Sequence, residues 1–232
     1  MARASSRLRP SLRAHAPGTS FEQERWKRGD SAVVGIDEVG KGAWAGPLTV
    51  GAVVIPVDRR IYKIRDSKQL TSAEREVMAI RIKDWALHWS VGHASAAECD
   101  ELGMSDAQRL ATARTLNALG VMPDHALIDG NWDFVEKIDT TTIVKGDARS
   151  LSIAAASIVA KVTRDAIMRE AARTYPWFAF ESNKGYPCHR QRAALELLGP
   201  STIHRRSWVY MENLAWDGIE ECRTEPQPMS LF

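Results

Sequence analysis

Residues 32–55 read AVVGIDEVGKGAWAGPLTVGAVVI, and this stretch decides the fold of the chain. It contains two apolar runs, residues 32–36 and 48–55, that are rich in β-branched side chains. Such runs are typical of buried strands. The glycines Gly40, Gly42 and Gly46 between them indicate a turn. The stretch therefore predicts an antiparallel pair of strands joined by a glycine-rich connection longer than a two-residue hairpin.

Helices and strands are mixed along the rest of the chain. Thr71 with Glu74 three residues later predicts a capping box, at the start of a helix that runs to about Trp85. The other expected elements are strands over 89–93, 126–128 and 140–144, and helices over 96–102, 105–119, 152–174, 189–198 and 208–214. The alanines of the long 152–174 helix would let it pack closely on a sheet. This order predicts an α/β domain whose helices cover a sheet.

The overall composition is that of an ordinary soluble globular protein, with 44% hydrophobic and 26% charged residues. A net charge of +2 is too small to indicate a nucleic-acid partner by itself. The three cysteines lack a CxxC spacing, and no apolar run approaches the length of a membrane span. We expect a cytoplasmic monomer with no membrane contact. We expect a disordered basic arm over 1–31, a catalytic domain over 32–215 and a disordered tail over 216–232.

Acidic residues follow three of the expected strands. Asp37 and Glu38 come directly after 32–36, Asp129 comes directly after 126–128, and Asp147 comes three residues after 140–144. Active sites in α/β sheets gather where strands release their loops. A single acid in such a place is more often a turn former, and Asp129–Gly130 is a good turn dipeptide. Four acids together favour a functional site.

Clustered carboxylates repel one another unless a cation neutralises them. Their hard oxygens suit Mg²⁺ or Mn²⁺, and two such ions about 4 Å apart can support displacement at a phosphodiester. Consecutive strand residues point to opposite faces, so Asp37 and Glu38 cannot be equivalent ligands on a regular strand. We expect a bend at the pair, or a contribution from the Glu38 backbone carbonyl. Asp37 is our candidate for the bridging ligand.

At this point the sequence resembles the ribonuclease HII family, the type 2 ribonucleases H. The segments that carry the resemblance occur in the family's order and cover roughly Val33 to Trp208. They are 35–47 (GIDEVGKGAWAGP), 66–70 (DSKQL), 127–131 (LIDGN), 144–147 (VKGD), 152–165 (SIAAASIVAKVTRD), 184–187 (KGYP) and 204–208 (HRRSW). Several blocks in order make this a specific match.

The resemblance implies a ribonuclease H-like fold, with a five-stranded mixed sheet flanked by helices and a helical C-terminal part. It implies hydrolysis of the RNA strand of RNA–DNA hybrids, leaving 3′-hydroxyl and 5′-phosphate ends, and incision 5′ of single ribonucleotides embedded in duplex DNA. Carried over by position, the metal-binding and catalytic carboxylates are Asp37, Glu38, Asp129 and Asp147.

The resemblance also assigns residues to the substrate. Gly40–Lys41–Gly42 falls on the family's Gly-Arg-Gly motif, whose backbone reads the ribose 2′-hydroxyl, and Tyr186 falls on the tyrosine that stacks on the sugar at an RNA–DNA junction. Lysine at 41 keeps the positive charge of the usual arginine but loses its bidentate fork. Phosphate contacts are expected from Lys68, Lys161, Lys184 and Arg206.

Other functions fit the sequence less well. Ser157 and Lys161 have the spacing S-x-x-x-K, rather than the S-x-x-K of serine–lysine hydrolases. The glycine-rich segment matches neither nucleotide-binding pattern, and the histidines show no HExxH. A resolvase or transposase would also use clustered carboxylates, but would not need the Gly-Lys-Gly turn together with Tyr186. A non-catalytic nucleic-acid binding module would not need a complete acidic set.

Overall fold

Five strands form one mixed sheet at the centre of the molecule. The computed structural model describes residues 16–59, 61, 64, 70–212 and 214. The strands lie in the order β3-β2-β1-β4-β5, where β2 is antiparallel to β1 and β3, and β4 is parallel to β1 and β5. Their bounds are β1 Val33–Val39, β2 Leu48–Val54, β3 His88–Ala94, β4 His125–Asp129 and β5 Thr140–Ile143. The expected antiparallel pair and five-stranded mixed sheet are confirmed.

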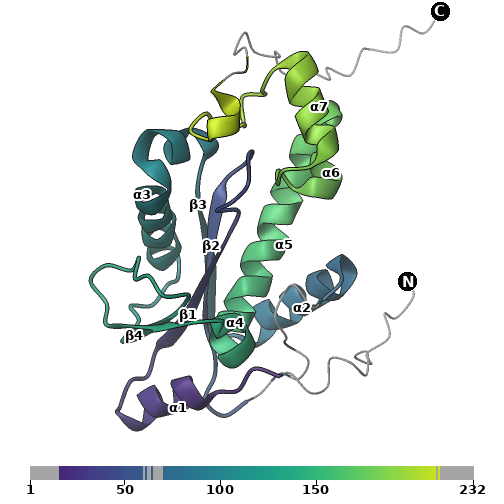
Figure 1. Ribbon diagram of the computed structural model, residues 1–232. Helices are drawn as coiled ribbons and strands as arrows, with labels where there is room; N and C mark the ends of the chain where they lie inside the picture. Colours follow the sequence, from purple (N-terminus) through teal and green to yellow (C-terminus); the bar gives the residue numbers. More distant parts are fainter. Residues whose placement is uncertain (1–15, 60, 62–63, 65–69, 213, 215–232) are drawn as a thin grey trace, which may run out of the picture.

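Helices cover both faces of this sheet. The helix α3 packs on β2 and β3, and α5 packs on the other face with α2 beside it (Figure 1). The helical bounds are α1 Ser20–Lys27, α2 Ser72–Trp85, α3 Ala96–Asn117, α4 Gly146–Arg149, α5 Leu151–Thr174, α6 Phe180–Asn183 and α7 His189–Leu198. Short 3₁₀ helices span Pro176–Phe178 and Val209–Met211. No helix in these described ranges is long and apolar enough to cross a membrane.

Most helix ends agree with the sequence. Thr71 and Glu74 form the expected capping box of α2, because the Thr71 amide donates to Glu74 Oε2 at 2.7 Å and the Glu74 amide donates to Thr71 Oγ1 at 3.3 Å. The two helices expected over 96–102 and 105–119 are confirmed as the two parts of α3, which separate at Gly103, where the backbone leaves helical geometry with φ +77° and ψ 162°. The helix expected over 208–214 is wrong in length, because among the residues described in that range only Val209–Met211 is helical.

The helix α5 lies unusually close to the sheet, as its small residues predict. A Cβ atom on Gly35 of β1 would come within 2.2 Å of the Ser152 carbonyl carbon, and one on Gly51 of β2 within 2.6 Å of the Ala156 carbonyl oxygen. Only glycine in the strands permits this approach. Because Gly51 pairs with Asp37 across the β1–β2 ladder, α5 passes directly over the first acid of the site.

The prediction that residues 1–31 form a disordered arm is wrong for Ser20–Lys27, which fold as α1. Residues 1–31 are rich in arginine, but they also contain Glu22, which is buried in the fold. The Glu22 side chain is fully buried, and its Oε1 accepts hydrogen bonds from Ser150 Oγ (2.7 Å), Ser152 Oγ (2.7 Å) and the Ser152 amide (2.9 Å). Glu22 thus ties the N-terminal segment to the start of α5. The predictions for residues 1–15 and for the tail over 216–232 lie outside the described residues.

We predict that Glu22→Ala lowers the free energy of unfolding by about 3 kcal/mol, because it leaves the buried hydroxyl and amide donors of Ser150 and Ser152 without their acceptor. Glu22→Gln is the matched control. It keeps an acceptor oxygen of the same shape and should lose clearly less. Urea denaturation of the three proteins gives the comparison, and an alanine variant as stable as the parent would contradict the anchoring role.

Candidate active site

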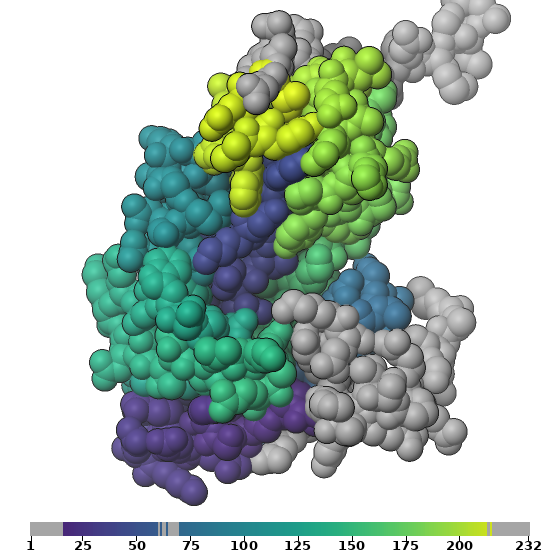
Figure 2. Space-filling view, viewed as in Figure 1, coloured from purple at the N-terminus to yellow at the C-terminus, as the bar shows by residue number. Residues whose placement is uncertain are grey.

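A cleft of about 360 Å³ opens at the end of β1, where the chain enters the glycine-rich turn. Its lining comes from residues 37–42, from Arg75 of α2, Asp129 of β4, Ser157 and Lys161 of α5, and from Tyr186. In the space-filling view the dark-blue segment that contains β1 and the turn is visible between the C-terminal elements and the teal segment after β4 (Figure 2). Elements far apart in the sequence therefore meet at one site.

Asp37 is the most buried acid that lines the cleft, with 7% of its surface exposed. Its Oδ1 accepts the Glu38 amide at 2.8 Å, and the Ser157 hydroxyl hydrogen-bonds to its carboxylate. Burial raises the pKa of Asp37 well above its usual value, and the neighbouring carboxylates Glu38 and Asp129 raise it further. The Ser157 hydrogen bond lowers the pKa but does not offset these effects. A positive charge at this point would favour the ionised form.

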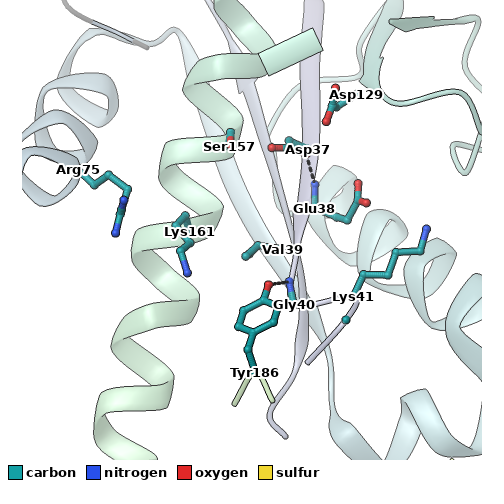
Figure 3. A pocket seen from close by; sticks show the side chains of 11 residues that line it. Asp37, Glu38, Val39, Gly40, Lys41, Arg75, Asp129, Ser157, Lys161 and Tyr186 are labelled. Atoms are coloured by element: carbon teal, nitrogen blue, oxygen red, sulfur yellow. Dashed lines mark hydrogen bonds between the residues drawn. The ribbon is translucent and has the colours of Figure 1, made fainter. Parts of the chain in front are cut away.

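Asp37 and Glu38 lie within β1 rather than after it, and they point to opposite sides. Both remain paired with β2, as Asp37↔Gly51 and Glu38↔Val50, so the bend expected at the pair is absent. Asp37 is directed toward Ser157 on α5, and Glu38 is directed away from α5 (Figure 3). The pairing of β1 with β4 stops at Ile36↔Ile128. At Asp37 and Glu38, β1 is therefore paired with β2 on one edge and with no residue of β4 on the other.

The other two acids stand at the ends of neighbouring segments. Asp129 is the last residue of β4, and its Oδ1 accepts the Gly146 amide at 2.6 Å. Asp147 does not follow β5 directly. Lys145 turns the chain with a φ of +56°, and Asp147 then lies in the short helix α4 with 5% of its surface exposed. Its charge contributes to the raised pKa of Asp37, which places it near the cleft although it does not line it.

The four carboxylates lie in or near the cleft, but their side chains are not grouped around a single point. In the part of the chain that the structure describes, no three acidic, histidine or cysteine side chains are grouped closely enough to hold a metal ion. The donor set itself fits a hard divalent cation, because such ions prefer carboxylate oxygens.

The glycine turn and Tyr186 meet at the opposite end of the cleft from Asp129 (Figure 3). The Gly40 amide donates to the Tyr186 hydroxyl at 3.1 Å. Gly40 has a φ of +93°, and a Cβ atom there would come within 2.2 Å of Arg164 Nε. By contrast, a Cβ atom on Gly42 would meet nothing within 4 Å. Gly40 is thus required by the fold, whereas the space beside Gly42 is open for another molecule to approach the backbone.

Two fully buried arginines, which the sequence reading missed, hold this turn in place. The Arg164 guanidinium donates to the carbonyls of Ala45, Pro47 and Lys184 at 2.8–3.0 Å. Arg205 donates to the carbonyls of Lys41 and Gly46 at 2.9–3.1 Å. Burial lowers the pKa of Arg164 to about 10. Arg164 stands seven residues after Ser157 on the buried face of α5, and this spacing could have revealed it.

The expected phosphate contacts divide between the cleft and other places. Lys161 lines the cleft, and its Nζ donates to Asp165 Oδ1 at 2.7 Å. Lys184 and Arg206 are not among the lining residues. The Lys184 ammonium donates to the Glu181 carbonyl, and the Arg206 amide donates to Asp100 Oδ2 at 2.7 Å. Lys68 lies outside the described residues. Arg75, which the sequence reading did not select, does line the cleft.

The sheet order, the long helix α5 and the acids at the end of β1 define a nuclease of the ribonuclease H-like class. The ribonuclease H2 of Pyrococcus horikoshii OT3 has the same fold, with a TM-score of 0.68 and 28% identity over 78% of this chain and 95% of that protein. The family model described as Ribonuclease HII matches residues 34–211. The chain belongs to the ribonuclease HII family.

Bacterial relatives agree with this assignment. The ribonuclease HII of Streptomyces avermitilis is 41% identical over 198 residues, which are 84% of this chain and 85% of the relative. The ribonuclease HII of Nitrosococcus oceani is 46% identical over 176 residues, 76% of this chain and 88% of the relative. The chain is therefore a ribonuclease H, an endonuclease that acts on RNA–DNA hybrids.

We predict that Gly40→Ala lowers the free energy of unfolding by about 2 kcal/mol, because its positive φ strains any other residue and its Cβ atom would strike Arg164. Gly42→Ala is the matched control in the same turn and should stay within about 0.5 kcal/mol of the parent. Thermal or urea unfolding provides the measurement. Equal losses for the two variants would show that the turn does not depend on close packing at Gly40.

Proposed function

We propose that this ribonuclease H needs a divalent metal ion, Mg²⁺ or Mn²⁺, and that it also incises duplex DNA on the 5′ side of a single embedded ribonucleotide. One observation carries the proposal. The acids of β1 and β4 line the same cleft as a glycine turn whose Gly40 amide is bonded to Tyr186. The groups suited to hold a metal ion thus lie beside the groups suited to recognise a ribose.

The residues that would hold the metal are Asp37, Glu38, Asp129 and Asp147. A bound divalent ion supplies Lewis acidity and lowers the pKa of water for attack on the phosphodiester. Asp37, on the α5 side of β1, would be one of the metal ligands, and the Ser157 hydroxyl orients its carboxylate. Glu38 approaches from the other side of the strand (Figure 3). The two adjacent acids therefore have different roles.

The residues that would recognise the ribose are Gly40, Lys41, Gly42 and Tyr186. A protein that distinguishes RNA from DNA at one nucleotide must sense the 2′-hydroxyl. The open space beside Gly42 lets backbone groups approach a sugar, and the Tyr186 ring offers a stacking surface that the Gly40 hydrogen bond keeps in place. The Lys161 ammonium, fixed by Asp165 and 5.8 Å from the centre of the Tyr186 ring, is available to a phosphate.

Lys184 and Arg206, which do not line the cleft, would contact phosphates outside it. Their positions fit contacts to more distant parts of a duplex, where cations position the backbone without reading sequence. Lys68 lies outside the described residues, so its contact with a phosphate stays a prediction from the sequence.

We predict that Asp129→Asn abolishes hybrid cleavage, by a factor of roughly 10³ or more, while the fold stays intact. The amide oxygen can still accept the Gly146 amide, but the charge that would bind metal is lost. Cleavage rates and Mn²⁺ binding by calorimetry are the measurements. Asp84→Asn is the control, because Asp84 is an exposed acid of α2 that does not line the cleft. Full activity in a folded Asp129→Asn protein would exclude the metal role of this residue.

We predict that Tyr186→Ala weakens incision at a single embedded ribonucleotide more than cleavage of a long hybrid, because a long hybrid offers many sites and does not depend on one junction. Tyr186→Phe keeps the ring and loses only the acceptor for the Gly40 amide, so its loss should be smaller. The ratio of kcat/KM on the two substrates is the measurement. An equal loss on both substrates would argue against stacking at the junction and leave the metal site untouched.

A further inference from the structure

Lys41 extends from the glycine turn toward an aromatic ring outside the cleft. Its Nζ lies 5.2 Å from the centre of the Trp132 ring, within the range of a cation–π interaction. Its carbonyl accepts a hydrogen bond from the buried Arg205 at 3.1 Å. Both the backbone and the charged end of Lys41 are therefore held, although its side chain is exposed.

The Trp132 ring is itself firmly placed. It is half-buried and packs against the core cluster between the sheet and α3. It also makes a tilted contact with the Phe134 ring, at 5.7 Å between centroids. A second cation, Arg109 of α3, lies 5.2 Å from the same ring and is fixed by Asp106 at 2.7 Å. The ring thus has a defined position from which to act on Lys41.

A lysine in this turn needs such a contact more than an arginine would. The planar guanidinium carries its own fork of donors, whereas an ammonium is a point charge on a flexible four-carbon stem. Fixing a free lysine side chain costs rotamer entropy. If the ammonium rests on an aromatic face, the side chain has already lost part of this freedom before the substrate binds. The positive charge then lies at the rim of the cleft.

We infer that Trp132 is a positioning residue, which holds the Lys41 ammonium at the rim of the cleft so that it contacts a backbone phosphate of the hybrid. This inference rests on the proposed binding of the hybrid in the cleft. Trp132 does not line the cleft, so it acts through Lys41 rather than on the substrate.

The test is a double-mutant cycle on hybrid cleavage with Trp132→Leu, Lys41→Met and the double variant. Trp132→Leu keeps apolar packing and removes the ring's charge attraction, so we expect KM to rise roughly two- to fivefold with kcat unchanged. Lys41→Met should raise KM at least as much and reduce the slope of log Kd against log salt by about one. In the Lys41→Met protein, Trp132→Leu should have no further effect.

Trp132→Phe is the matched control, because it keeps an aromatic face and should restore most of the parent KM. A Trp132→Leu effect that persists in the Lys41→Met protein would mean that the ring contacts the substrate itself, and would overturn the inference. So would a lower melting temperature with unchanged KM, which would indicate a purely structural role. If the parent cleaves the hybrid and Lys41→Met equals the parent, only this inference fails. If the parent does not cleave the hybrid with metal, the proposed function fails.

Discussion

The close approach of α5 to the sheet is the constraint on which the rest of the molecule depends. Gly35 and Gly51 remove the side chains that would keep this helix away from β1 and β2. The helix then brings Ser157 to Asp37 and carries Arg164 to the glycine turn. The same helix begins beside Glu22 and just after Asp147. Small residues at one interface therefore fix the position of acids, cations and turn together.

The glycine turn is held by hydrogen bonds from two buried guanidinium groups as well as by packing. Arg164 and Arg205 are fully buried, and their guanidinium groups bind backbone carbonyls of the turn. Backbone bonds add to this, since the Trp44 amide donates to the Gly185 carbonyl at 2.8 Å and joins the turn to the loop that carries Tyr186. A recognition element made of backbone groups needs such support, because the backbone near a glycine is otherwise free to move.

The sequence predicted the sheet and the long helices, because apolar periodicity and capping residues are local signals. It could not predict what depends on distant contacts. Glu22 lies in an arginine-rich segment that has no periodicity, and its partners are about 130 residues away. Arginine is normally an exposed residue, so nothing in the sequence indicated that Arg205 is buried, and only the seven-residue spacing from Ser157 indicated that Arg164 lies on the buried face of α5. Side-chain alternation correctly made Asp37 and Glu38 inequivalent, but the expected bend is absent because β1 stays paired with β2 past both residues.

The most direct test of a metal-dependent ribonuclease that recognises one ribose is incision of duplex DNA that carries a single ribonucleotide. The chain is incubated with this duplex in Mg²⁺, in Mn²⁺ and in EDTA, beside an all-DNA duplex and a long RNA–DNA hybrid, and the products are resolved on a denaturing gel. We expect one cut, on the 5′ side of the ribonucleotide and only with metal, and no cut in the all-DNA duplex. Incision in EDTA, cleavage of the all-DNA duplex, or cleavage of the hybrid alone would contradict the account.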